Sequence, residues 1–145
     1  MEGQRTKATF KALRETVGLS QDNVAKDLGV SVISVKRWER PGYQYPPADA
    51  WEYMLDAYRA HCDAVNGALD QVDEIADFVG RYPELVSITY WRTQEQYDRL
   101  ERDPGHVGMI NARARAVGGG LLEQGIEVEW RFPEEGAVST PGSRY

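Results

Sequence analysis

One stretch decides the fold of this chain: Leu19-Ser-Gln-Asp-Asn-Val-Ala-Lys-Asp-Leu-Gly-Val-Ser-Val-Ile-Ser-Val-Lys-Arg-Trp-Glu39. Ser20 and Ser31 are good helix N-caps, and each stands directly before a run of residues with helical spacing. Gly29 stands where a helix needs a residue in the left-handed conformation. The stretch therefore predicts two helices, over residues 21–28 and about 32–40, joined by the short turn 29–31.

The side chains of this stretch fit a helix-turn-helix. Ala25 is small where the second helix must cross the first closely, and Val35 and Trp38 would face inward. The outward residues of the second helix would be Val32, Ile33, Lys36 and Arg37. A preceding helix over 6–17, whose apolar residues share one face, completes a three-helix unit.

The pattern resembles the Cro/C1-type (XRE) helix-turn-helix family, in which Leu-Ser-Gln, Ala, Leu-Gly-Val-Ser and Trp-Glu recur at these spacings. The similarity covers about residues 7–42 without gaps and departs at Pro41, which replaces the glycine usual there and is followed by Gly42. The resemblance implies that the helix starting at residue 32 enters the major groove of double-stranded DNA. It implies base contacts from Val32, Ile33 and Arg37, with Ser31, Ser34 and Lys36 beside them. It also implies a phosphate contact from Gln21.

The chemistry of these side chains suits such contacts. The guanidinium of Arg37 can pair with guanine O6 and N7, and Val32 or Ile33 can pack on a thymine methyl group. Core packing of the two aliphatic residues and an ordinary solvated face for the cations remain the alternatives. Tyr43 and Tyr45, in the following loop, either contact phosphates or pack on their own domain.

The charge distribution is uneven along the 145 residues. The net charge of −6 divides into +3 for residues 1–45 and −9 for residues 46–145. Such an asymmetry is expected when one part of a protein contacts an anionic partner and the rest does not. We therefore expect DNA contacts from the first 45 residues.

A long amphipathic helix is predicted over residues 49–79. Its apolar residues alternate at spacings of four and three, which is a heptad pattern: Trp51, Leu55, Tyr58, Cys62, Val65, Leu69, Val72, Ala76 and Val79. Two interpretations fit this seam. It either pairs with the same helix of a second chain or packs within the chain onto the C-terminal strands.

The last third mixes strands and helices. Strands are expected over 85–91 and 126–132, with a short helix from Thr93 to about residue 102 and a longer helix from residue 107 to a stop at Gly125. Gly118-Gly119-Gly120 indicates tight packing or a helix break. Residues 133–145 are expected to form a disordered tail. The segments 87–93, 111–115 and 125–128, with Tyr97, loosely resemble the dimerising C-terminal region of YdiL-like regulators, which include anti-CRISPR-associated repressors.

Several classes of function are disfavoured. With a single cysteine and two histidines, neither a disulfide framework nor a zinc ligand set is expected, and Cys62 lies on the heptad seam as a core residue. No catalytic constellation, cofactor motif or metal motif is evident, so an enzyme is not expected. Without a long apolar run or a signal peptide, the expected location is the cytoplasm, away from membranes.

The sequence thus predicts a mostly α protein with a small α+β C-terminal part. Residues 1–45 would form the helix-turn-helix DNA-binding domain, residues 46–132 a long helix with a two-strand, two-helix dimerisation region, and residues 133–145 the tail. The expected function is a sequence-specific transcriptional regulator, a homodimeric repressor that binds an inverted repeat. The alternative is an antitoxin-like module that neutralises a protein partner and autoregulates its operon.

Overall fold

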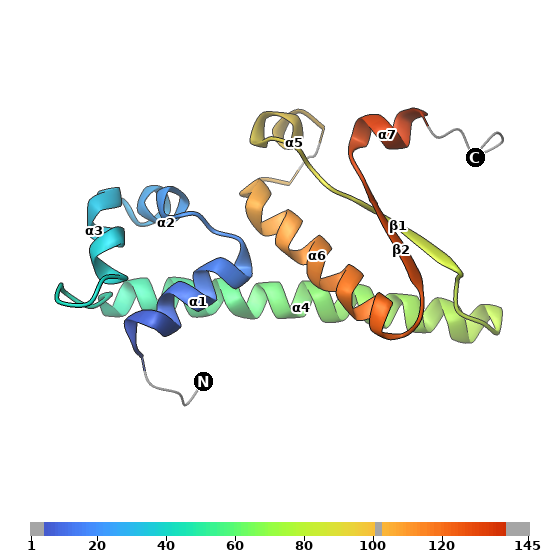
Figure 1. The fold of residues 1–145 in the computed structure, drawn as a ribbon, viewed down its shortest axis with the longest axis horizontal. Coiled ribbons are helices and arrows are strands. Elements are labelled where there is room, and N and C mark those ends of the chain that lie inside the picture. Colours follow the sequence, from blue (N-terminus) through green and yellow to red (C-terminus); the bar gives the residue numbers. More distant parts are fainter. Residues whose placement is uncertain (1–4, 101–102, 139–145) are drawn as a thin grey trace. The chain divides into compact units, whose positions relative to one another are not determined.

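The structure is a computed structural model that describes residues 5–100 and 103–138. It is mostly helical, and its elements follow the order α1, α2, α3, α4, β1, α5, α6, β2, α7 (Figure 1). The chain divides into two compact units, Met1–Cys62 and Asp63–Tyr145. Helix α4, Ala48–Val79, begins in the first unit and continues into the second.

Three short helices open the first unit: α1 (Lys7–Val17), α2 (Gln21–Leu28) and α3 (Val32–Trp38). The predicted caps are present, since the hydroxyls of Ser20 and Ser31 accept the backbone N–H groups of Asn23 and Ser34. Gly29 takes the left-handed conformation at the end of α2, with φ of 68°. These local signals explain why the expected boundaries of α2 are confirmed.

The exit from α3 differs from the expected end near residue 40. The helix ends at Trp38, and Arg40 to Tyr43 form a turn in which the Tyr43 N–H donates to the Arg40 carbonyl over 3.4 Å. Gly42 has a φ of 93°, and Pro41 precedes it. Proline followed by a glycine at positive φ is the composition of a type II turn. With proline at position 41, the residue that must adopt a positive φ is therefore Gly42, one position later than the glycine usual in the family.

Aromatic residues from three helices form the core of the first unit. Phe10 lies edge-on to Trp38 and Trp51, with ring centroids 6.0 and 5.2 Å apart. Met54 is fully buried as well. Because Trp51 and Met54 belong to α4, the first turns of this helix are part of the helix-turn-helix core. The first unit therefore extends to Cys62, beyond the boundary expected at residue 45.

The second unit contains a two-stranded sheet of β1 (Leu85–Thr89) and β2 (Glu127–Arg131). The strands are parallel, with Val86 opposite Val128 and Ile88 opposite Trp130. The connection runs through α5 (Gln94–Leu100) and α6 (Val107–Glu123), as parallel pairing requires a long crossover. Helix α6 lies against the sheet (Figure 1).

The triple glycine is a packing device, and α6 continues through it to Glu123. A Cβ atom on Gly118 would lie 2.1 Å from the ring of Trp130, and one on Gly120 would lie 3.0 Å from the side chain of Leu69. A Cβ atom on Gly119 would meet nothing within 4 Å. Tight packing, one of the two expectations, is confirmed at two of the three glycines.

The C-terminal segment of the second unit differs from its expected structure. Residues 133–138 were expected to be disordered, but they form helix α7, Pro133–Val138, while residues 139–145 lie outside the described residues. Proline at the first helical position, with Glu134 and Glu135 in the first turn, favours this helix start.

On the heptad seam, the contact of Leu69 with Gly120 supports packing within the chain at that position.

Candidate nucleic-acid interface

Helix α3 separates its side chains cleanly into two faces. Val35 and Trp38 are buried, whereas Lys36 and Arg37 are exposed and Ile33 is 56% exposed. The remaining predicted contact residues also lie on the accessible side: Ser31 is exposed, and Val32 and Ser34 are half-buried. Six of the seven predicted site residues therefore belong to one surface at the start and outer face of α3.

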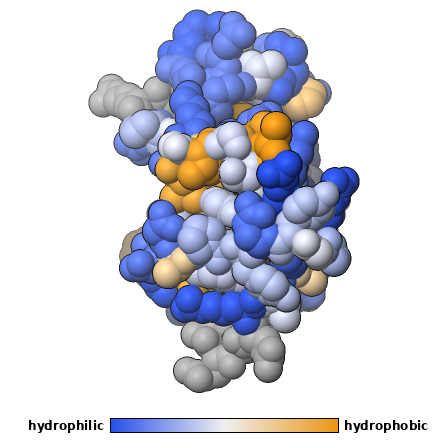
Figure 2. Space-filling model, turned by 90° about the vertical axis from the view of Figure 1, so that its left-hand side faces the viewer, coloured by the Kyte–Doolittle hydropathy of each residue, from blue (hydrophilic) through white to orange (hydrophobic). Residues whose placement is uncertain are grey.

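Figure 2 views the side of the molecule on which Figure 1 draws α3 and shows apolar surface among hydrophilic surface. Among the exposed large apolar residues, Val30 and Ile33 belong to the turn before α3 and to α3 itself. For Ile33, core packing is thus wrong, while the half-buried Val32 is intermediate between the two interpretations.

The seventh predicted residue, Gln21, lies at the first position of α2 and is half-buried. Its side-chain amide donates to Oε1 of Glu39 over 3.1 Å. Glu39 also accepts two bonds from the Arg14 guanidinium, at 2.6 and 2.9 Å. The Arg14 and Glu39 side chains are only 10% and 4% exposed. This buried ion pair joins α1 to the end of α3, and Gln21 attaches α2 to the same carboxylate.

A basic hollow of about 550 Å³ lies beside α3 and gathers residues that the sequence did not assign to the site. Lys11 from α1 and Arg40 from the turn after α3 join the predicted residues Lys36 and Gln21 along its walls. All three basic side chains belong to exposed residues. Glu39 also lines the hollow, with its carboxylate paired to Arg14. A concave surface with three cations beside an exposed helix is suited to a polyanion, because focused positive potential attracts phosphates.

Lys7 holds the C-terminal end of α3 in place. Its buried ammonium group donates to the carbonyls of Arg37, Trp38 and Gln44 at 3.0, 3.0 and 2.5 Å. The same Nζ lies 4.7 Å from the ring centroid of Tyr45. Burial lowers the pKa of this amine below its ordinary value. Three carbonyl acceptors and an aromatic face together replace the water that the ammonium has lost.

Both loop tyrosines lie against cations of their own unit. The Arg37 guanidinium carbon is 5.6 Å from the ring centroid of Tyr43, and Tyr45 covers Lys7. Intramolecular packing, one of the two expectations for these rings, is therefore present, and both rings remain exposed. Because Tyr43 lies beside Arg37, it limits the directions in which the guanidinium can extend.

The positioning residues Lys7 and Arg14 were not recognised in the sequence, although a signal exists. Lys7, Phe10, Arg14 and Val17 follow the spacing of one helix face, so two charged residues occupy core-facing positions. Charged side chains are buried in proteins chiefly when they are paired, which points to partners such as Glu39 and the carbonyls at the end of α3.

Two further properties of the described residues bear on the class of site. None of the helices in the described residues is long and apolar enough to cross a membrane. Within residues 5–100 and 103–138, no group of three or more histidine, cysteine or acidic residues is placed to hold a metal ion.

Comparison with known protein families gives a match to the first unit. Residues 8–66 match the family model of a helix-turn-helix domain, the motif that places its second helix in the major groove of DNA. No curated protein matches the sequence. The matched range includes nearly all of α1, all of α2 and α3, and α4 up to residue 66. Over residues 8–66, the sequence is therefore similar to a helix-turn-helix domain, in agreement with helices α1, α2 and α3.

Proposed function

We propose that the protein is a sequence-specific DNA-binding transcriptional regulator, and that it acts by binding rather than by catalysis. The observation that carries this proposal is the exposed face of α3 beside the basic hollow of Lys11, Lys36 and Arg40. Exposed Ile33 and Arg37 would read base edges in the major groove, while the cations of the hollow would contact phosphates.

The two kinds of contact predict different mutational effects. A guanidinium that pairs with a guanine typically discriminates against the wrong base by about 1–3 kcal/mol. A phosphate contact weakens binding to all sequences alike. Arg37→Ala should therefore weaken binding to the preferred site and relax the preference at one base pair in each half-site. Lys11→Ala should weaken binding without changing the preference.

The test uses sites selected from random duplex DNA by the wild-type protein. Binding of the selected site and of its single-base variants is then measured by fluorescence anisotropy at two salt concentrations. If the Arg37→Ala protein folds normally but keeps both affinity and base preference, α3 does not read bases in the major groove. A wild-type protein that enriches no sequence would argue against specific DNA binding altogether.

We further propose that the protein is a homodimeric repressor that binds an inverted repeat. The support is apolar surface on the second unit at the end of α4, where Ile75, Phe78 and Val79 are exposed, with Phe78 at 93%. Large exposed apolar side chains in a group are typical of association surfaces. A twofold dimer would present two α3 helices to half-sites about one turn of DNA apart, roughly 34 Å.

The alternative, an antitoxin-like module, uses the same surface for a different partner. The exposed residues at the end of α4 lie next to acidic Asp73, Glu74 and Asp77, a combination that also suits a basic protein. The two proposals separate by stoichiometry. A homodimer forms from the purified chain alone, whereas neutralisation requires a stable complex with a product of the neighbouring gene.

A further inference from the structure

We propose that the second unit contains a binding site for a small amphipathic carboxylate, with Arg113 as the residue that binds the carboxylate group. The site is a cavity of about 460 Å³ between the C-terminal half of α4, the end of β1 and helix α6. This volume lies within the range of small-molecule sites, about 300–1,000 Å³. The proposal concerns the second unit only and is independent of the DNA-binding proposal.

Small and apolar residues leave the space open. Ala64 and Ala68, one helical turn apart on α4, form one wall. Ile110 and Val117 lie on the opposite wall, on the face of α6 that also carries Arg113. Alanine side chains on α4 leave room where larger residues would fill the gap, so the cavity is a product of the sequence at these positions.

The aromatic end of the cavity is held in place by contacts within the chain. Trp91 and Tyr97 both line it, and their rings meet edge to face with centroids 5.3 Å apart. The buried side chain of Asn111 exchanges two hydrogen bonds with the backbone of Trp91, at 2.9 and 2.8 Å. A preformed aromatic wall lowers the entropy lost on binding and favours the apolar part of a ligand.

Arg113 contributes to this cavity a buried polar atom that lacks a partner. Its Nε atom is buried and has no hydrogen bond, and within the part of the chain that the structure describes the residue forms no ion pair. Yet carboxylates are abundant, since residues 63–145 hold fifteen acidic and eight basic residues. A buried guanidinium N–H without an acceptor is unfavourable, and a ligand carboxylate is its best acceptor because the two groups can form paired bonds.

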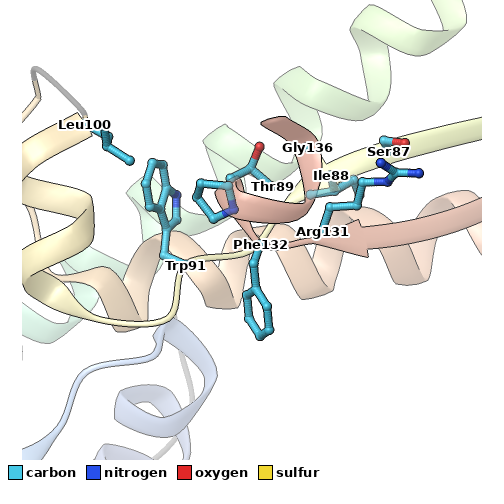
Figure 3. A pocket seen from close by; sticks show the side chains of 9 residues that line it. Ser87, Ile88, Thr89, Trp91, Leu100, Arg131, Phe132 and Gly136 are labelled. Atoms are coloured by element: carbon cyan, nitrogen blue, oxygen red, sulfur yellow. The ribbon is translucent and has the colours of Figure 1, made fainter. Parts of the chain in front are cut away.

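A second cavity of the same unit provides the contrast. It has a volume of about 370 Å³, and Figure 3 shows Trp91 beside Leu100 at one end and Arg131 beside Ser87 at the other. There the guanidinium is already bound to Glu129 and donates to the carbonyl of Glu135 over 3.4 Å. An anion in this cavity would compete with Glu129, whereas one beside Arg113 would not displace a bound carboxylate.

Asp103 is the acidic residue that lines the Arg113 cavity, and it is exposed. It makes no ion pair with Arg113 in the structure. Its charge would oppose an incoming carboxylate, so the proposal expects octanoate to bind Asp103→Asn at least as tightly as the wild type. If instead Asp103→Asn lowered the unfolding temperature as much as Arg113→Met, the guanidinium would be partnered by Asp103 and the proposal would fail.

The direct test compares octanoate with 1-octanol by isothermal titration calorimetry on the full chain. The wild type should bind octanoate at least tenfold more tightly, a difference of about 1.4 kcal/mol. Arg113→Met keeps the apolar stem and should remove this preference, while Arg113→Lys should retain part of it. Arg99→Met, at an exposed position of α5, removes the same charge and should bind like the wild type.

A filling variant keeps the proposal testable if Arg113→Met unfolds. Ala68→Leu should abolish binding of both octanoate and 1-octanol, because its longer side chain occupies the space between α4 and α6. The proposal is overturned if the folded wild type binds no octanoate at millimolar concentration, if the preference for octanoate survives in Arg113→Met, or if Ala68→Leu binds octanoate as the wild type does.

Discussion

At the scale of single residues, the helix-turn-helix depends on charged side chains that occupy core positions. Arg14 on α1 reaches Glu39 after α3 and also donates to the Leu19 carbonyl over 3.0 Å. Breaking a buried ion pair from one side leaves the other charge buried without compensation. The position of α3 therefore depends on a polar contact as well as on the aromatic core.

This ion pair predicts a large loss of stability when Arg14 is replaced by an uncharged residue. Arg14→Met should lower the free energy of unfolding by about 3–5 kcal/mol, because Glu39 would remain buried without its cation. Lys11→Met is the matched control, since Lys11 is exposed and its pair with Glu15 spans 4.0 Å; it should change stability by less than about 0.5 kcal/mol. Urea denaturation measures both, and similar values for the two variants would contradict the assigned role of the buried pair.

At the residue scale, some side-chain roles could be predicted from the sequence and others could not. The outward residues of α3 were predictable because each side chain of a short helix follows from its spacing to Val35 and Trp38. The roles of Lys7 and Arg14 were not predicted, because a lysine or arginine on a helix is normally interpreted as solvated. The partners of Lys7 and Arg14 lie about thirty residues away in the chain. The periodicity of the sequence does not reveal such distant partners.

At the scale of elements, the crossing of α6 with the sheet depends on a missing side chain. The indole of Trp130 fills the space where Gly118 would carry a Cβ atom, and its Nε1 donates to the Ala114 carbonyl over 3.1 Å. Glycine inside a helix ordinarily lowers helix stability by about 1 kcal/mol relative to alanine. At this position the cost is offset by the packing of a tryptophan.

Two adjacent alanine substitutions should therefore have opposite effects. Gly118→Ala should destabilise the second unit by about 1–3 kcal/mol, since its methyl group overlaps the ring of Trp130. Gly119→Ala should stabilise the protein by about 0.5–1 kcal/mol, because no atom lies within 4 Å of its Cβ position. Thermal unfolding followed by circular dichroism measures both; equal shifts for the pair would be inconsistent with this packing.

Helix α7 gives a prediction about pH. The Arg92 guanidinium lowers the pKa of Glu134 to about 2 by hydrogen bonding, while an unperturbed glutamate has a pKa of about 4.3. A carboxylate whose pKa is lower in the folded than in the unfolded chain stabilises the folded state at pH values above the unfolded pKa. This contribution is lost as the pH falls from about 4 towards 2. NMR titration of the Glu134 side chain checks the value. Arg92→Gln should return it towards 4.3, whereas Arg99→Gln should not.

Elements differ in how well they could be predicted. The ends of α2 followed from Ser20 and Gly29, which act through their own neighbours in the chain. The parallel direction of the strands could not be derived, since alternation along residues 126–132 is the same for either direction. Helix α7 was missed because its polar composition resembles that of a disordered segment.

At the scale of the whole molecule, two compact units share one long helix, and their surfaces differ in character. The first unit presents cations around α3, whereas the second exposes large apolar side chains at the end of α4. The charge asymmetry of the sequence, +3 for residues 1–45 and −9 for residues 46–145, indicated a difference in surface character but not the boundary after Cys62. The sequence did not locate the exposed apolar group, because the heptad pattern treats Ala76 and Val79 alike while the structure buries one and exposes the other.

The proposed homodimer should depend on this apolar group. Sedimentation equilibrium at micromolar concentration should show about twice the chain mass of 16.4 kDa. Phe78→Glu should yield monomers, because two negative charges would enter the interface. Leu100→Glu, which changes an exposed leucine of α5 away from this surface, is the control and should remain dimeric. A Phe78→Glu protein that is still dimeric would place the interface elsewhere.

The parallel pairing of β1 with β2 has a consequence for how the chain folds as it is made. Partners in this sheet are 42 residues apart, as Ser87 and Glu129 are, so β1 has no strand partner until the whole crossover has been synthesised. The first unit needs only residues up to Cys62, and its helices are built from local contacts, which form quickly. Domains generally fold in order from the N-terminus during synthesis. The nascent chain should thus form its helix-turn-helix first. Leu85 to Thr89 remain an unpaired strand until β2 has been synthesised. Because the backbone of this strand is exposed in that period, the chain should then be most vulnerable to aggregation.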